Sequence, residues 1–229
     1  MADLVYLSIW LRDYHASNML KHWKRVIDSF PASLISPGIR SLTIYPFHWG
    51  ETPVFERNFG EGTPADDVMN LAAEFLHEDY AYEVELSWDL WLPNPSQDSR
   101  EWVHAPSTVS VACMGAEFDH PDSEEGRQPE ATGELRDDMP RDDIDDRANI
   151  QINFGLDTPF LPPEEDVFPE LDPDFDPDLT DLQIQKNLQQ LIGFVHVLDQ
   201  KLPVIKRVLW CESGENLAEK ILEAWNMRL

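Results

Sequence analysis

The chain of 229 residues has little cysteine, little positive charge and no long apolar run. Its two cysteines, Cys113 and Cys211, are too few for a disulfide framework, and their apolar surroundings predict reduced, buried thiols. Apolar runs such as Val5–Leu11 end far short of the ~20 residues that a membrane-spanning helix needs. Residues 1–6 have neither the basic start nor the small-residue cleavage site of a signal peptide, which predicts a cytoplasmic protein.

Positive charge is scarce, because 17 Lys and Arg residues stand against 44 Asp and Glu residues, for a formal net charge of −27. Nucleic-acid backbone and anionic membrane surfaces are bound by clustered basic residues, so neither is an expected direct partner. The negative charge is concentrated in residues 117–146 and residues 157–181, which each carry a net charge of −10. The rest of the chain therefore has the charge balance of an ordinary globular protein.

The two acidic segments differ in composition, and we predict different structures for them. In residues 119–147 like charges repel, and apolar side chains are too few to offset a chain entropy of roughly 1–2 kcal/mol per residue. This segment is predicted to be a mobile loop between two strands. Residues 157–181 hold six prolines together with apolar residues such as Phe160 and Phe168. That composition indicates an ordered, extended crossover.

Residues 1–93 alternate between strand-like and helix-like hydrophobic patterns. Alternation with a period of two predicts strands at 4–11, 41–47, 54–59 and 82–90, and helical spacing predicts helices at 17–30 and 63–76. Ser17 and Thr63 are the expected N-caps, with Pro64 as the first helical residue of the second helix. The order β-α-β-β-α-β is that of a ferredoxin-like unit, a four-stranded antiparallel sheet with two helices on one face.

Residues 94–229 continue as a second α+β half in the order β-β-α-β-α. After a connection over 93–106, strands are predicted at 108–118, 150–157 and 204–211, and helices from Thr180 and over 214–227. The first two strands would form a hairpin with the acidic loop at its tip. Thr180–Gln183 matches a capping box, and the helix it opens spaces its apolar residues 4-3-4-3-4. Three strands alone would enclose little core, so we predict one compact α+β body with a mainly antiparallel sheet.

No complete catalytic or cofactor motif is present in the sequence. There is no Gly-x-Ser-x-Gly, no phosphate-binding glycine loop and no paired-histidine spacing, so we assign no catalytic residue. The alternating acids of Asp172–Asp178 are the nearest approach to a calcium loop. The sixth and twelfth positions of such a loop need Gly and Glu, and here they hold Pro177 and Gln183. We therefore expect neither a metal nor a cofactor.

Five residues are the candidates for a ligand site. His48 and Glu51 lie close together near a predicted turn, where an imidazole beside a carboxylate suits acid–base work. Glu83 and Glu85 share one face of a predicted strand at a spacing of ~7 Å, and paired carboxylates can act as acid and base or hold a cation. Trp91 lies beside the connection between the halves, where an aromatic side chain can line a cleft.

Two functions are compatible with these patterns. The lack of a reactive constellation and the concentrated acidic segments favour a non-enzymatic cytoplasmic binding or regulatory protein that acts through protein association, with a basic protein as partner. The heptad-like helix is also suited to a homodimer contact. The alternative is a small-molecule-binding or enzymatic α+β protein with a pocket between the two halves.

Overall fold

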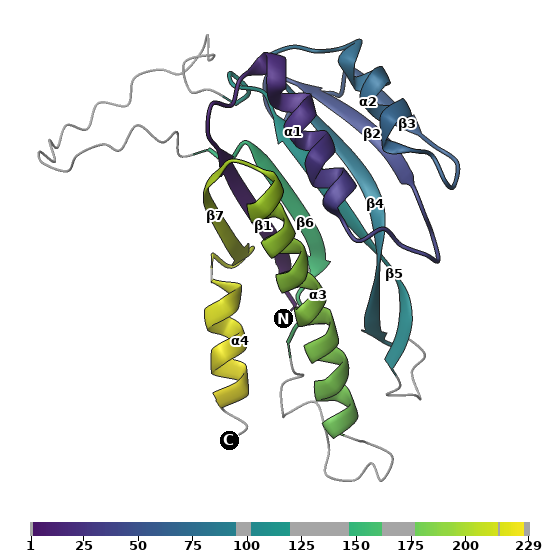
Figure 1. Cartoon of the computed structure of the whole chain (residues 1–229), viewed down its shortest axis with the longest axis vertical. Helices are drawn as coiled ribbons and strands as arrows, with labels where there is room; N and C mark the ends of the chain where they lie inside the picture. The colour runs from purple at the N-terminus through teal and green to yellow at the C-terminus, as the bar shows by residue number, and fades with distance from the viewer. Residues whose placement is uncertain (1, 95–101, 120–146, 162–176, 215, 227–229) are drawn as a thin grey trace, which may run out of the picture.

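The computed structural model describes residues 2–94, 102–119, 147–161, 177–214 and 216–226, and the elements follow the predicted order (Figure 1). The strands are β1 (Leu4–Leu11), β2 (Ile39–Pro46), β3 (Phe55–Asn58), β4 (Tyr80–Pro93), β5 (Trp102–Met114), β6 (Ile150–Leu156) and β7 (Val204–Cys211). The helices are α1 (Ala16–Ser29), α2 (Ala65–Ala73), α3 (Pro177–Lys201) and α4 (Leu217–Asn226). The predictions of a loop at 119–147 and of a crossover at 157–181 fall mostly outside the described residues.

All seven strands belong to one antiparallel sheet in the order β3-β2-β4-β5-β6-β1-β7. The ferredoxin-like sheet predicted for residues 1–93 is not confirmed, because β1 pairs with β6 and β7 and not with a strand of its own half. The correction is a larger sheet that both halves build together. Hydrophobic alternation specifies that residues 4–11 form a strand, but partner choice depends on tertiary packing that the pattern does not encode.

The hairpin predicted around the acidic segment is confirmed in its strands. β5 and β6 are antiparallel neighbours, with Cys113 opposite Ile150. The predicted connection over 93–106 is too long, because β4 extends to Pro93 and β5 begins at Trp102, directly opposite it. Three prolines in this stretch, Pro93, Pro95 and Pro106, obscured the strand pattern, although proline is tolerated at strand ends and edges.

Two helix N-termini differ from the predicted caps. α1 begins at Ala16, and its N-cap is His15 instead of Ser17. α2 begins at Ala65, so Pro64 occupies the N-cap position. The hydroxyl of Thr63 donates to a loop carbonyl and does not cap the helix. Cap positions are set by how the preceding loop approaches the helix, which local preference does not determine.

α3 also begins earlier than predicted, at Pro177, and the expected cap Thr180 is a buried residue inside its first turns. The helix packs on the protein's own sheet through one stripe of its heptad-like residues, including the buried Ile184, Leu191 and Leu198. A homodimer contact through this helix stays a prediction.

The hydrophobic core lies between one face of the sheet and the helices. α1, α2 and α3 cross this face, and α4 lies against β7 (Figure 1). Val5, Leu7 and Ile9 of β1 point into the core, where Trp23 of α1 is fully buried and donates its indole N–H to the Val111 carbonyl at 3.1 Å. Among the described residues no helix combines the length and the apolarity that crossing a membrane requires.

Candidate functional site

The candidate site lies on the sheet face opposite α1, α2 and α3, called here the open face. Successive residues of a strand point to opposite faces, so the residues between the core positions of β1 point to this side. The open face is formed by Tyr6, Ser8 and Trp10 of β1, Gln151 and Asn153 of β6, Ser110 and Ala112 of β5, and Glu83 and Glu85 of β4. It therefore combines large aromatic rings with amide, hydroxyl and carboxylate groups.

An aromatic cluster covers the β7 side of the open face. Trp210 of β7 stacks on Tyr6, with 4.6 Å between ring centroids, and its indole N–H donates to the Ser8 hydroxyl at 3.0 Å. The ammonium of Lys206 lies 4.5 Å from the ring centroid of Trp10, a distance at which a cation–π contact is favourable. These cross-strand contacts hold the rings in place and form a firm wall for a site.

The loop after β2 places Trp49 over the middle of the open face. Its ring contacts Tyr45 and Phe118, each with a centroid separation of 5.1 Å. Phe47 begins the loop with a positive φ of 58°, which is uncommon for a residue with a side chain. Two backbone hydrogen bonds fix this turn, from Phe47 N–H to the Asp79 carbonyl at 2.8 Å and from Asp119 N–H to the Phe47 carbonyl at 2.6 Å.

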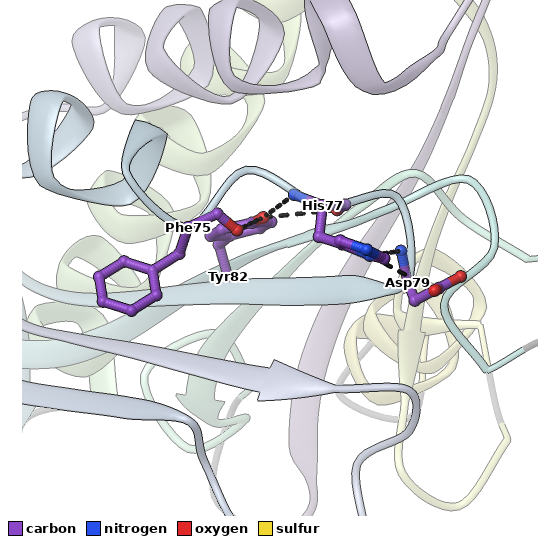
Figure 2. Close-up of polar contacts among 4 residues, drawn as sticks. All are labelled: Phe75, His77, Asp79 and Tyr82. Carbon is purple, nitrogen blue, oxygen red and sulfur yellow. Dashed lines mark hydrogen bonds and ion pairs between the residues drawn. The ribbon is translucent and has the colours of Figure 1, made fainter.

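The connection between α2 and β4 carries the Asp79 carbonyl that this turn contacts, and Figure 2 shows the polar contacts within that connection. The buried Tyr82 hydroxyl accepts the His77 N–H at 2.8 Å and donates to the Phe75 carbonyl at 2.8 Å. Burial raises the pKa of Tyr82 to about 12, so the hydroxyl remains a donor at neutral pH. The Asp79 N–H donates to Nδ1 of His77 at 3.3 Å. These bonds hold the Asp79 carbonyl where Phe47 binds it, which makes them structural supports of the Trp49 loop.

Two cavities of the open face share lining residues and are called here, together, the Trp49 groove. The larger is about 600 Å³ and includes Trp10, Trp210 and Phe118 in its lining. The smaller is about 270 Å³ and is lined by Tyr6, Trp49, Glu83, Ser110, Ala112, Gln151 and Asn153. Trp49 and Gln151 line both cavities. The groove reaches from β7 to β4, which is four strand spacings or about 19 Å.

Glu83 is the acidic side chain in the wall of the smaller cavity. Burial raises the pKa of its carboxyl group, and the neighbouring charge of Glu85 adds to the increase. Hydrogen bonds from Ser110 and Tyr45 oppose this change without cancelling it. The carboxylate has therefore lost part of its hydration, and the hydrogen bonds from Ser110 and Tyr45 do not fully replace it. Such a group gains most from a ligand that brings a positive charge or a hydrogen-bond donor.

The other predicted ligand residues are distributed over the surface. His48 and Glu51 do meet, with 3.4 Å between Nε2 and Oε1, but both side chains are about half exposed beside the groove-lining Trp49. Glu85 follows Glu83 on the same strand and is exposed. Trp91 lies eight residues along β4 from Glu83, a distance of about 26 Å in a strand. The predicted residues thus do not form one cluster.

Sequence reasoning missed most of the aromatic residues of the groove. Trp10, Trp49 and Trp210 were not among the candidate residues, because a tryptophan in a sequence is more often buried in a core than part of a site. The available signal was the phase of β1, in which Tyr6 and Trp10 alternate with the apolar Val5, Leu7 and Ile9. Large rings on the polar side of an amphipathic strand indicate a surface that is not an ordinary solvated face.

A cluster of Asp3, Asp157 and Cys211 has the residue types of a metal site, but a lysine occupies its centre. The ammonium of Lys220 lies 2.9 Å from a carboxylate oxygen of each aspartate. Burial lowers the pKa of Lys220, but the hydrogen bonds to Asp157 and Asp3 outweigh it and raise the pKa overall. The cluster is therefore an ion-pair network that fixes α4 to the ends of β1 and β6.

The buried thiol of Cys113 is not suited to nucleophilic chemistry. It contacts the Tyr14 hydroxyl at 3.1 Å, and that hydroxyl donates to the Met114 carbonyl at 2.6 Å. Burial raises the pKa of Cys113 to about 12, so the reactive thiolate is disfavoured at neutral pH. Both cysteines are free and buried, which confirms the placement predicted for them.

The described geometry is that of a binding surface with aromatic walls, a polar floor and one partly desolvated carboxylate. Its floor comes from five neighbouring strands, which are rigid elements, and its upper wall from one braced loop. Comparison with protein-family models, with curated proteins and with solved structures finds no match for this chain.

Proposed function

We propose that this chain is a non-enzymatic binding protein that holds a segment of a protein partner in the Trp49 groove. The observation that carries the proposal is that two cavities share Trp49 and Gln151 in their linings and together extend across the open face from β7 to β4. An extended peptide rises ~3.3 Å per residue, so a groove of about 19 Å matches roughly six residues of partner chain.

The chemistry of the lining supports a protein partner. Tryptophan and tyrosine are enriched among the residues that dominate protein interfaces, because they bury a large area and lose little side-chain entropy. Gln151 and Asn153 lie on the floor of the groove, and each amide can both donate to and accept from a peptide backbone. The apolar Val208 extends the wall on β7. The lining therefore provides apolar contact area together with polar groups that set the register of a bound chain.

A second candidate function is small-molecule binding, which the volume of the larger cavity favours. Ligand pockets commonly measure ~300–1,000 Å³, and this cavity of about 600 Å³ falls within that range. Residues of both halves line it, Trp10 and Trp49 from the first and Phe118 and Trp210 from the second. The partner proposal is preferred because it also accounts for the smaller cavity and for the residues that the two cavities share.

The test is a selection from a random dodecapeptide library against the immobilised protein, followed by affinity measurements on individual peptides. We expect selected peptides to lose at least about tenfold in affinity when Trp49 is replaced by alanine, because a central aromatic anchor is removed. Trp91→Ala is the matched control, because Trp91 lies at the far end of β4. The affinity of this variant for the selected peptides should stay within about twofold of wild type. Circular dichroism confirms that both variants are folded.

The proposal is abandoned if no selected peptide depends on Trp49 while the Trp49→Ala variant remains folded. A small-molecule screen by thermal shift on the same two variants addresses the second candidate. Stabilisation by a compound that is lost with Trp49→Ala, combined with failure of every peptide, supports that candidate in place of the first.

A further inference from the structure

The smaller cavity contains the elements of a cation-binding subsite. Glu83 lies in its wall, and the rings of Tyr6 and Trp49 are also part of the lining. Tyr45 extends this aromatic surface, because it contacts Trp49 at a centroid distance of 5.1 Å and hydrogen-bonds to Glu83. A carboxylate surrounded by aromatic rings is complementary to an ammonium or guanidinium group, which pairs with the acid and lies against the ring faces.

We infer that this subsite binds a lysine or arginine side chain of the partner segment, so that the ligand of the groove is a basic peptide. The inference rests on the proposed function and specifies its partner. The cationic group would form an ion pair with Glu83 while its aliphatic stem contacts Trp49. Ser110 and Asn153 supply further polar groups at the same position.

Charge complementarity favours a basic ligand over a neutral one. Glu85 is on the same strand face as Glu83, and Glu56 of β3 is in the same cross-strand row, since both Glu56 and Glu83 pair with Thr43. The whole chain carries a net charge of −27, which attracts cationic partners and repels acidic ones. Burial raises the pKa of Glu83. This is expected for a carboxylate that has lost hydration which the hydrogen bonds from neighbouring residues do not fully replace.

The groove is electrostatically asymmetric, and this asymmetry orients the ligand. Its β4 end holds Glu83, whereas the larger cavity is lined by one acid and one base, Asp119 and Arg147, and Lys206 lies over Trp10 near the β7 end. The two ends are about 19 Å apart, or roughly six residues of extended chain. A partner segment is therefore expected to place its cationic side chain at β4 and its apolar or aromatic residues toward Trp10 and Trp210.

The inference is tested with the peptides selected on the complete chain. We expect enrichment of Lys or Arg at one position, and at least a tenfold loss of affinity when norleucine replaces that residue. Glu83→Gln, which keeps the size of the side chain and removes its charge, should cause a similar loss and reduce the dependence of affinity on salt concentration. Glu61→Gln is the matched control, because Glu61 is an exposed acid outside the groove and its change removes the same charge.

A pH titration gives a second readout. Affinity for wild type should fall as the pH approaches the raised pKa of Glu83 from above, and Glu83→Gln should show a flatter profile. The titratable groups around Glu83 are Glu85 on its own strand, Glu56 on β3, Tyr45 on β2 and Tyr6 on β1. Burial raises the pKa of both tyrosines above 10, so they stay neutral in this range and the titration reports on the carboxylates.

Failure of the inference and failure of the proposed function give different results. Peptides that need Trp49 but carry no conserved cation, and that bind Glu83→Gln as tightly as wild type, overturn the cation subsite and leave the groove as a binding site. Peptides that bind independently of Trp49 overturn the proposed function itself. If Glu83→Gln does not fold, the norleucine peptides decide the question on the wild-type protein.

Discussion

Asp89 shows how a single buried acid can fix a loop that sequence patterns leave undefined. Its carboxylate accepts hydrogen bonds from the Ser33 hydroxyl and from the N–H groups of Leu34 and Ile35. Burial raises the pKa of Asp89, but these bonds outweigh burial and lower the pKa overall. The side chain therefore anchors the connection between α1 and β2 to β4.

Replacement of Asp89 by alanine should destabilise the protein by about 2–3 kcal/mol, because it leaves several donors without their acceptor. Since the pKa of Asp89 is lower in the folded state, its contribution is complete above the ordinary value of 3.8 and is lost as the pH falls through the folded-state pKa. Urea unfolding of wild type and variant across acidic and neutral pH measures both effects. Glu74→Ala, an exposed acid at the end of α2, should change stability by less than about 0.5 kcal/mol. An Asp89→Ala loss that is the same at every pH would contradict this role.

The residues of the candidate site were only partly predictable from sequence. Glu83 was found because strand alternation places it on a polar face with Glu85, and the structure places it in a cavity wall. Trp49 was not found, because its position depends on the Phe47 turn and on the Asp79 carbonyl that fixes it. Contacts between residues so distant in sequence leave no local pattern.

At the scale of elements, a buried asparagine, Asn187, contributes polar contacts that attach α3 to the sheet. The Asn187 side chain accepts the N–H of Trp91 at 2.9 Å and donates to the Trp91 carbonyl at 2.8 Å, as a neighbouring strand would. It also donates to the carbonyl of Pro159 at 2.8 Å. Asn187 thereby joins α3 to β4 and to the residues that follow β6.

Asn187→Ala should lower the free energy of unfolding by about 2–4 kcal/mol, because it removes three hydrogen bonds and leaves their backbone partners unpaired. The matched control is Gln189→Ala, two residues away on the exposed side of α3, which should be nearly neutral. Chemical denaturation measures both changes. Equal stability of the two variants would show that the hydrogen bonds of Asn187 do not stabilise the attachment of α3.

The order of the elements was predictable because each has a clear hydrophobic period, whereas their limits and caps were not. β1 matches its predicted bounds, since its alternation continues from Leu4 to Leu11. α3 begins at Pro177 instead of Thr180, although Thr180 has the local signature of a cap. A cap signature shows that a residue can begin a helix, and tertiary contacts determine whether it does.

At the scale of the whole molecule, the sheet order is the property that sequence patterns described least well. The two halves have the predicted elements. However, β1 of the first half lies between β6 and β7 of the second, so strands from both halves are neighbours in one sheet. The Trp49 groove depends on this arrangement, because Tyr6 and Trp10 of β1 lie beside Gln151 of β6 and Trp210 of β7. Neither predicted half would contain the site by itself.

Charge is the other whole-molecule property that connects to the proposed function. Residues 120–146 contribute a net −8 to the total of −27. The flanking residues Asp119 and Arg147 both line the larger cavity, and the Arg147 side chain donates to the Phe118 carbonyl at 2.7 Å. The residues on either side of this segment therefore belong to the groove, and we expect the net charge of −8 to increase the rate at which a basic partner arrives.

Replacing residues 120–146 with a Gly-Ser hexapeptide should leave the fold intact, because Arg147 and Phe118 already lie within one side-chain length. Shortening the connection between Asp119 and Arg147 by this amount should stabilise the protein by about 1 kcal/mol, because less chain entropy is lost on closing it. The association rate of a cationic peptide should fall and its salt dependence should weaken, while the dissociation rate stays nearly constant. A second variant, in which Asn and Gln replace the acids of 120–146 at unchanged length, should reproduce the kinetic effect without the gain in stability. Stopped-flow binding and thermal melting separate the two contributions, and a faster dissociation in both variants would mean that the segment contacts the ligand directly.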